Sequence, residues 1–362
     1  MQATSDLEQR VRAHLAEIDR VGLRRVMRPP SGVDLSSNDY LGLAAHPLIK
    51  ERMSEAVKEL GAGSTGSRLL RGNRECFEAV EEKFARFKGT ERALYFSSGY
   101  LANLAVLTTF PEESDTVFSD SLNHASLIDG VRLSRAQRDI YPHATVPKAR
   151  GQFLVTESLF SMDGDIAPLR ELAALGANLI VDEAHAVGIY GPTGSGLIEE
   201  TGIGSSVFLS VNTAGKALGV SGAFVCGPAW AIEYMVQRAR PFIFSTAPPP
   251  SIAAALDASL DVIAGEPERR TRLRKLGRYL RQRLALPERD APIVSIMVGD
   301  NDRAVALAEA LQHDGFDVRA IRPPTVPAGT ARLRISINCN LTEAILDRFA
   351  TALEHAQCAA SS

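Results

Sequence analysis

Short apolar runs alternate with segments of helical period between about residue 40 and residue 240 of the chain. The runs cover residues 93–96, 116–119, 153–156, 179–181, 207–211 and 223–226. Strands that alternate with helical segments are typical of βαβ units, whose strands pair in parallel. The pattern therefore predicts an α/β fold, with a largely parallel sheet in a large domain.

One helix between two of these runs can be read directly from the sequence. Pro168 stands in its predicted first turn, Leu169, Leu172 and Leu175 form its apolar stripe, and Gly176 ends it. The next predicted strand then ends at Asp182. Because ligands of open α/β sheets bind beyond the carboxyl ends of the strands, Asp182 is placed where a site is expected.

The pattern differs on either side of this region. Beyond the prolines at 248–250, a helix-rich stretch precedes runs of alternating polarity at 293–298, 317–321 and 332–337. These runs predict a smaller α+β domain whose sheet has one face in water. Near the N-terminus, apolar residues at 7, 11, 15 and 18 follow a helical period, and Ser5 with Glu8 predicts a capping box. We expect an N-terminal helix and arm over 1–40, a large domain over 41–240 and a small C-terminal domain over 241–362.

Composition narrows the class of protein. The 362 residues carry a net charge of -3, which gives no basic footprint for nucleic acid. No apolar run approaches the roughly 20 residues of a membrane helix, and the N-terminus lacks the apolar core of a signal peptide. The four cysteines are far apart, so neither a zinc site nor a disulfide framework is indicated. We expect a cytoplasmic protein that binds neither a membrane nor a metal.

Two sequence motifs suggest nucleotide chemistry but lack its context. Gly61-Ala-Gly-Ser-Thr-Gly66 matches a dinucleotide fingerprint, yet it follows a predicted helix over 47–60 and not a strand. Asp182-Glu-Ala-His185 spells the acidic box of some helicases. Those enzymes need a phosphate loop, and Gly215-Lys216 is followed by Ala217 and not by Ser or Thr. The first motif therefore does not indicate a dinucleotide site, and the second does not indicate an ATPase.

The combination of a loop lysine, a strand-end acid and a small-residue turn favours carbonyl-cofactor chemistry. Lys216 lies among small residues, where it is either a solvated charge or a nucleophile that forms an imine. Asp182 is either a solvated carboxylate or the partner of a protonated ring nitrogen, with His185 three residues on. A small-residue turn such as the one at Gly99 most often has no function beyond connecting a strand to a helix. Its free amides at the start of the helix can, however, bind phosphate. Thr213 adds a hydroxyl.

Taken together, the motifs resemble those of the α-oxoamine synthases. The similar segments are 35–43, 123–127, 157–165, 181–185, 213–219 and 244–246, and the likeness runs from about 24 to 337. This family consists of pyridoxal 5′-phosphate enzymes of fold type I that condense an amino acid with an acyl thioester and release CO₂. The resemblance implies that cofactor, fold and reaction type.

The resemblance also implies a role at each matching position. Lys216 would form the imine, Asp182 would pair with the ring nitrogen, His185 would reach the ring oxygen and His124 would stack on the ring. The remaining cofactor positions would be Gly99, Tyr100 and Thr213 at the phosphate, Ser161 near the cofactor, and Ser245 and Thr246 reaching the phosphate from the second subunit of a homodimer. Substrate positions would be Arg334 at the α-carboxylate with Asn38 beside it, and Arg24 and Thr325 on the acyl side.

Within the family, residues 320–334 most resemble the biotin-pathway member, which implies L-alanine and either pimeloyl-CoA or pimeloyl acyl carrier protein as substrates. Two stretches, 28–34 and 138–151, are shorter than the family pattern, and both lie near the expected path of the thioester. Three alternatives stay open from sequence. They are a sister enzyme that uses glycine, an aminotransferase, and a non-catalytic partner subunit, which would be expected to have lost Lys216 or Asp182.

Overall fold

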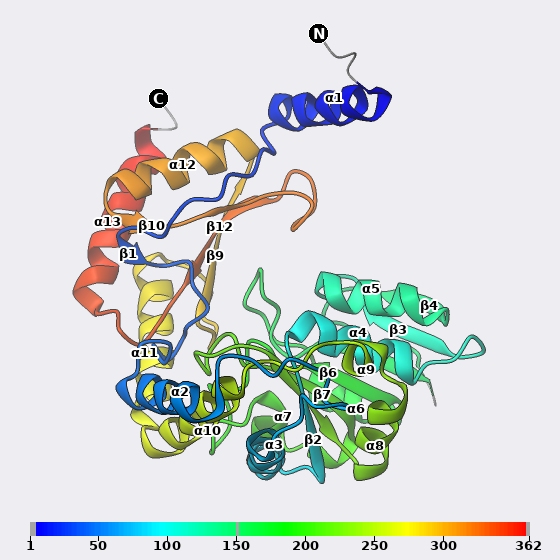
Figure 1. Cartoon of the computed structure of the whole chain (residues 1–362). Coiled ribbons are helices and arrows are strands. Elements are labelled where there is room, and N and C mark those ends of the chain that lie inside the picture. Colours follow the sequence, from blue (N-terminus) through cyan, green and yellow to red (C-terminus); the bar gives the residue numbers. More distant parts are fainter. Residues whose placement is uncertain (1–4, 150–151, 360–362) are drawn as a thin grey trace. The chain divides into compact units, whose positions relative to one another are not determined.

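A computed structural model describes residues 5–149 and 152–359 (Figure 1). The chain forms two compact units. Unit 1 comprises residues 1–37, 276–337 and 341–362, and unit 2 comprises residues 38–275 and 338–340. This division differs from the predicted boundaries at 40 and 240. The stretch beyond 240 joins the large unit because α10 (Pro250–Gly265) packs against α2 (Pro47–Leu60) and α3 (Glu75–Lys88).

Seven strands of the described residues form one sheet in unit 2, in the order β2-β8-β7-β6-β5-β3-β4. Every pair from β7 to β4 is parallel, and β8 runs antiparallel to both β2 and β7. The bounds are β2 (Arg92–Phe96), β3 (Thr116–Asp120), β4 (Gln137–Tyr141), β5 (Phe153–Glu157), β6 (Asn178–Asp182), β7 (Val207–Thr213) and β8 (Ala223–Gly227). The predicted α/β fold with a largely parallel sheet is confirmed.

The six predicted strands of this region are all present, and β4 is an additional one. Four of the five residues of β4 are exposed, and β4 is one of the two edge strands, pairing only with β3. An edge strand with an exposed face needs no apolar run, so its sequence gave no signal. The predicted helix after Pro168 is present as α6 (Leu169–Ala173), and Gly176 adopts φ +67° just beyond it.

Helices cover both faces of this sheet (Figure 1). Successive side chains of a strand point to opposite faces, and β8 shows the consequence. Its Val225 belongs to the core beneath α4 (Gly99–Thr109), α5 (Ala125–Ser134) and α8 (Ala229–Arg238). The neighbouring Phe224 stacks on Phe84 of α3, with ring centroids 3.9 Å apart, on the other face. The shorter helices of the unit are α7 (Leu197–Thr201), η1 (Gly204–Ser206) and α9 (Arg240–Ile243).

Unit 1 is an α+β unit built around a three-stranded antiparallel sheet, β11-β12-β9. Its strands are β9 (Ile293–Gly299), β11 (Ala320–Ile321) and β12 (Ala331–Ser336), and the parallel pair β1 (Val33–Asp34) and β10 (Phe316–Asp317) lies outside that sheet. Its helices are α12 (Asn301–His313) and α13 (Glu343–Ala359), while α11 (Glu268–Arg283) crosses the division at residue 276.

The prediction that this sheet has one face in water is wrong for β12. All six residues of β12 are buried, including Arg332 and Arg334. A buried guanidinium is tolerated when its hydrogens are bonded. Accordingly, Arg332 Nε donates to the carbonyl of Thr330, and Arg334 Nη1 lies 2.7 Å from Ser336 Oγ. Alternating polarity therefore did not mark alternating exposure here.

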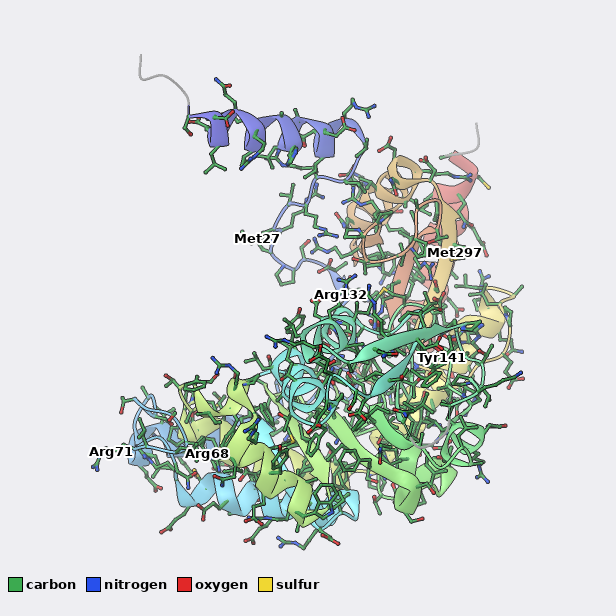
Figure 2. All side chains as sticks on the ribbon, turned by 90° about the vertical axis from the view of Figure 1, so that its right-hand side faces the viewer. Met27, Arg68, Arg71, Arg132, Tyr141 and Met297 are labelled. Atoms are coloured by element: carbon green, nitrogen blue, oxygen red, sulfur yellow. The ribbon has the colours of Figure 1, made fainter. Side chains whose placement is uncertain are left out.

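The N-terminal helix α1 (Asp6–Arg20) begins at Ser5, whose hydroxyl accepts from Glu8 N at 3.1 Å. This confirms the predicted cap, although the Glu8 carboxylate pairs with Arg12. No described residue of α1 is buried, so the predicted apolar stripe lies in solvent. Residues 24–32 of the arm that follows are also exposed, and Met27 among them is fully exposed (Figure 2). Among the described residues, no helix is both long and apolar enough to cross a membrane.

Unit 2 contains a buried ion pair that involves Glu183, the residue directly after β6. Lys88 Nζ lies 2.5 Å from Glu183 Oε2, and both side chains are almost wholly shielded from water. Lys88 also donates to the carbonyl of Ser195, and Glu183 Oε1 accepts from Ile198 N. Removing one partner of such a pair leaves an uncompensated buried charge, which is more costly than losing the pair.

We expect Lys88→Met to lower the free energy of unfolding by about 3–5 kcal/mol. Lys83→Met is the matched control, because Lys83 pairs with Asp257 and Asp261 at a half-exposed position and should lose less than about 1 kcal/mol. Urea unfolding of both variants measures the difference. Equal losses of unfolding free energy in the two variants would show that burial of Lys88 does not increase the cost of removing it.

Candidate active site

Polar side chains gather at the carboxyl ends of the parallel strands in unit 2. Asp182 ends β6 and is 5% exposed, Glu157 ends β5 as its paired neighbour, and Thr213 ends β7. The register places Asp182 beside Val211 on the other side. The predicted position of Asp182 at this edge of the sheet is therefore observed.

Lys216 lies in the tight connection between β7 and β8. Ala214 N donates to the carbonyl of Gly222, and Gly222 adopts φ +80° where an added Cβ would meet the Tyr95 ring. The turn is thus closed by a residue that must be small. Lys216 Nζ lies 2.9 Å from His185 Nε2, so the amine and the imidazole that the sequence predicted to act together are in contact.

A hydrogen-bonded series continues from His185 toward Asn38. His185 Nδ1 lies 2.7 Å from the hydroxyl of Tyr40, and that hydroxyl lies 3.1 Å from Asn38 Oδ1. His185 is 4% exposed and Tyr40 is fully buried. The series fixes the plane of the imidazole that faces Lys216. Tyr40 lies within a segment that was recognised in the sequence, but its role was not predicted.

The Asp182 carboxylate is held by two donors. Its Oδ1 accepts from Ala184 N at 2.8 Å, and its Oδ2 accepts from Asn103 Nδ2 at 2.7 Å. Asn103 is on α4, in a helix that the sequence marked only as the one following Gly99. No pattern could have identified it, because its partner is 79 residues away along the chain.

Burial and the charges of Asp182 and Lys216 shift the pKa values of His124 and Glu157. Desolvation by the surrounding protein lowers the pKa of His124, the Lys216 charge lowers it further, and Asp182 opposes them. Burial raises the pKa of Glu157 to about 8, with the Asp182 charge acting in the same direction and Lys216 opposing. Glu157 is therefore largely neutral near pH 7, so Asp182 has no second full negative charge at its side.

The turn between β2 and α4 offers a site for an anion. Ser98 caps α4, its hydroxyl accepting from Leu101 N at 3.2 Å. A Cβ added at Gly99 would lie 2.5 Å from Thr213 Oγ1, so the backbone approaches that hydroxyl as only glycine allows. Amides at a helix start beside a hydroxyl suit a phosphate. The predicted residues Gly99 and Thr213 are thus brought together.

The donor set fits pyridoxal phosphate. An amine, a strand-end carboxylate with fixed donors, an imidazole and a glycine-lined helix start provide a partner for each polar part of the cofactor. The Tyr100 ring is part of α4, is exposed, and its hydroxyl donates to Asp129. Ser161 follows β5 in a half-buried loop.

The remaining predicted residues belong to other segments of the chain. Thr246 pairs with Ser67 in an isolated bridge, and Ser245 precedes it in the same loop. Arg24, Thr325 and Arg334 belong to unit 1, where Arg24 pairs with Asp19 at 3.0 Å. Arg24 and Thr325 line one cavity of about 350 Å³ in that unit.

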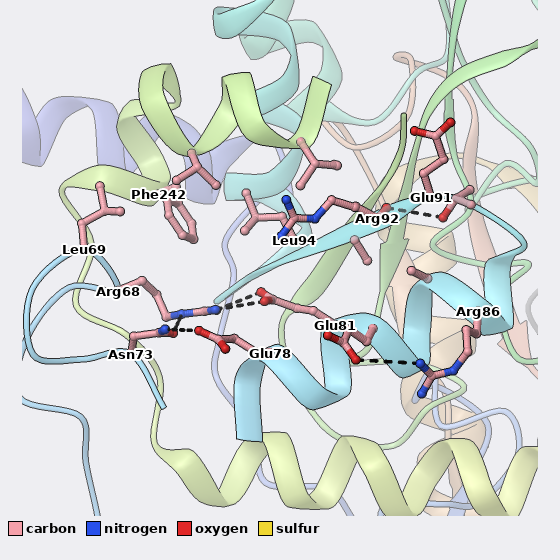
Figure 3. A pocket seen from close by; sticks show the side chains of 16 residues that line it. Arg68, Leu69, Asn73, Glu78, Glu81, Arg86, Glu91, Arg92, Leu94 and Phe242 are labelled. Atoms are coloured by element: carbon pink, nitrogen blue, oxygen red, sulfur yellow. Dashed lines mark hydrogen bonds and ion pairs between the residues drawn. The ribbon is translucent and has the colours of Figure 1, made fainter. Parts of the chain in front are cut away.

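A larger cavity of about 480 Å³ in unit 2 lies apart from Lys216, between α3, β2 and Phe242 (Figure 3). Its Arg68 forms two bonds of 2.8 and 2.9 Å to the carboxylate of Glu81, which also accepts from Tyr95 N. This buried pair anchors the segment that contains Ser67, and hence the loop of Thr246. We assign the cavity a structural role.

The lysine, the acid and the phosphate cradle at the carboxyl edge of this sheet define a pyridoxal-phosphate enzyme of fold type I. The comparisons with known proteins agree. The chain matches the aminotransferase class I and II family over residues 30–353, and it belongs to that family.

Curated relatives narrow the assignment further. The proteins of Anaeromyxobacter dehalogenans (46% identical, over 94% of both chains) and Ralstonia pickettii (43% identical, over 96% of both chains) are each named 8-amino-7-oxononanoate synthase. A serine palmitoyltransferase from S. paucimobilis, solved with an adduct of PLP and myriocin, is similar at a TM-score of 0.91 and 30% identity, over 99% of this chain and 100% of that one. An 8-amino-7-oxononanoate synthase from Francisella tularensis is similar at a TM-score of 0.80 and 31% identity, over 91% of this chain and 98% of that one. The predicted family, fold and cofactor are confirmed.

One histidine ties the loops around this site together. His143 Nδ1 lies 2.9 Å from Asp120 Oδ1 at the end of β3, and its Nε2 lies 2.6 Å from Asp165 Oδ2 in the loop after Ser161. Partial burial lowers the pKa of His143, but the hydrogen bonds to Asp120 and Asp165 outweigh it and raise the pKa above its usual value. A raised pKa in the folded state means that the stabilisation is complete below the unfolded pKa and is lost as pH rises through the folded one.

We expect His143→Gln to cost about 1–3 kcal/mol of unfolding free energy below about pH 6, and progressively less at higher pH. Denaturant unfolding across pH measures this dependence. His313→Gln is the control, because that side chain is 92% exposed. A loss from His143→Gln that grows with rising pH would contradict the assigned sign.

Proposed function

We propose that this chain condenses L-alanine with a pimeloyl thioester, giving 8-amino-7-oxononanoate, CO₂ and a free thiol. The observation that carries the proposal is the contact between the Lys216 amine and His185, at the sheet edge where Asp182 ends β6. It is supported by relatives that match along nearly their full length and are named 8-amino-7-oxononanoate synthase. The thiol carrier is either coenzyme A or an acyl carrier protein.

Pyridoxal phosphate, when bound, supplies an electron sink for negative charge that develops at the α-carbon of the amino acid. Lys216 is the group that moves the proton. Its amine, when free, would take the α-proton as a general base and later return a proton to the product. Contact with His185 keeps the amine at the sheet edge between these steps.

Asp182 would hold the proton on the ring nitrogen of the bound cofactor by accepting a charge-assisted hydrogen bond from it. Its own two donors, Ala184 N and Asn103 Nδ2, fix the direction of the carboxylate without neutralising it. The neutral state of the Glu157 carboxyl removes the like charge that would otherwise oppose Asp182.

His124 is assigned to the acyl transfer. Part of the residue is open to solvent, while desolvation of the rest lowers the pKa of the ring. The Asp182 and Lys216 charges also act on that pKa, so His124 lies near both groups. A ring hydrogen aimed at the thioester carbonyl stabilises the oxygen as negative charge develops there. Release of the thiol then leaves a carbonyl beside the carboxylate, which permits loss of CO₂.

The substrate's two ends are assigned from the sequence. Arg334 would hold the α-carboxylate, with Asn38 beside the substrate. Arg24 and Thr325 would take the acyl side, which is supported by their lining the same cavity in unit 1. Gly99, Tyr100 and Thr213 would hold the phosphate.

We also propose a homodimer in which Ser245 and Thr246 reach the phosphate of the partner. Two observations support it. Thr246 is exposed and follows Phe244, which is 70% exposed, so this loop presents apolar surface to solvent. The stripe of α1 is likewise uncovered within the chain. A second copy would cover such surface.

A panel of substrates tests the reaction. L-alanine, glycine and L-serine would each be combined with pimeloyl, acetyl, succinyl and palmitoyl thioesters, and thiol and CO₂ release would be measured. L-serine with palmitoyl-CoA belongs in the panel because of the similarity to serine palmitoyltransferase. We expect equal amounts of thiol and CO₂ only with L-alanine and the pimeloyl thioesters.

In the same assay, Lys216→Ala should lower turnover by at least about a hundredfold, since general base catalysis is lost. Lys58→Ala, in the last turn of α2, is the control and should retain activity. Preference for glycine with acetyl-CoA, or release of a keto acid without thiol, would overturn the proposed function.

A further inference from the structure

A buried series of hydrogen bonds joins the Asp182 carboxylate to the His124 ring. Asn103 Nδ2 lies 2.7 Å from Asp182 Oδ2 and 2.9 Å from Ser126 Oγ. Ser126 Oγ lies 2.7 Å from His124 Nδ1. Asn103 is 2% exposed and Ser126 is fully buried, so water does not compete for these bonds.

The direction of every hydrogen in this series follows from the charge of Asp182. An ionised carboxylate only accepts, so the Asn103 atom beside it is the amide nitrogen, which donates. The second amide hydrogen is directed to Ser126 Oγ, which accepts it. The hydroxyl then has one hydrogen of its own to donate, and His124 Nδ1 is the acceptor within reach.

His124 Nδ1 receives a second donor from the backbone. Ser126 N donates to it at 3.2 Å, which makes His124 the cap of α5. A neutral imidazole has one N–H, and a nitrogen that accepts two hydrogen bonds cannot be the one that bears it. The hydrogen of the ring is therefore on Nε2.

We propose that Asn103 and Ser126 are positioning residues that hold His124 as the neutral Nε2–H tautomer, a hydrogen-bond donor toward the acyl carbonyl. Desolvation and the Lys216 charge, which lower the pKa of His124, act in the same direction by keeping the ring neutral. The role toward the carbonyl rests on the proposed function. The tautomer itself does not.

Asn103 uses both of its amide hydrogens in this series. One is directed toward Asp182 on β6 and the other toward Ser126 on α5. This is the arrangement that transmits hydrogen direction from Asp182 to His124.

Fixing the tautomer matters because the opposite one would present a lone pair to an oxygen that gains negative charge. Loss of a single donor at such an oxygen costs about 10²–10³ in turnover. We therefore expect Ser126→Ala to lower kcat with little change in the KM for L-alanine. Ser126→Thr, which keeps a hydroxyl, should restore much of kcat.

Nitrogen-15 NMR of histidine-labelled protein measures the tautomer directly, with pyridoxal phosphate bound and again after its removal. The His124 signals are assigned by their absence in His124→Gln. We expect an unprotonated Nδ1 and a protonated Nε2 at neutral pH in the unaltered protein. In Ser126→Ala the neutral ring loses a donor, so the titration of His124 should move up by roughly one pH unit.

Two further variants make the result decisive. Ser259→Ala is the matched control, since Ser259 is also fully buried and donates only to the carbonyl of Leu218. It should leave His124 unchanged. Asn103→Leu keeps the side-chain volume while removing both donors, and it should shift His124 in the same direction as Ser126→Ala, which covers the case in which one variant does not fold.

A protonated Nδ1 in the unaltered protein would overturn the inference, as would equal His124 titration in Ser126→Ala and Ser259→Ala. Because this measurement uses no acyl substrate, it is independent of the substrate panel. An enzyme that failed to make 8-amino-7-oxononanoate could still show the fixed tautomer, and an active enzyme could lack it.

Discussion

A single buried carboxylate organises the site. Asp182 lies at the end of β6, where the parallel sheet opens, and it is 5% exposed. A charge in that position is tolerated only because donors are supplied, here Ala184 N and Asn103 Nδ2. The same charge orients Asn103, then Ser126, then His124, and it is opposed by no second anion because burial keeps Glu157 largely neutral near pH 7. The groups assigned to catalysis therefore depend on one acid.

The edge of the sheet supplies the remaining geometry. Thr213 and Asp182 end adjacent strands, and the tight connection closed by Gly222 returns Lys216 to the same edge, within 2.9 Å of His185. The glycine at 99 lets the start of α4 approach Thr213. Elements distant in sequence thus meet because parallel strands all end on one side.

Much of this arrangement could be predicted from residues alone. Strands buried on both faces read as apolar runs, which is why β5 and β6 were placed correctly, and the end of a predicted strand identified Asp182. Properties that depend on tertiary contacts could not be predicted. The exposed edge strand β4 has no apolar run. Arg332 and Arg334 are buried, although the alternating polarity of their segment predicted a sheet face in water. Asn103 lies on a helix 79 residues before its partner, and only the fold brings the two together.

The proposed chemistry requires covalent attachment of the cofactor to Lys216. Borohydride reduction of the purified protein followed by mass analysis of its peptides locates that attachment. We expect the added mass of the reduced pyridoxyl group on the peptide that contains Lys216. The variant His185→Ala, which leaves the amine in place, should carry the group on the same peptide. Attachment at another lysine, or none, would contradict the assignment of this site.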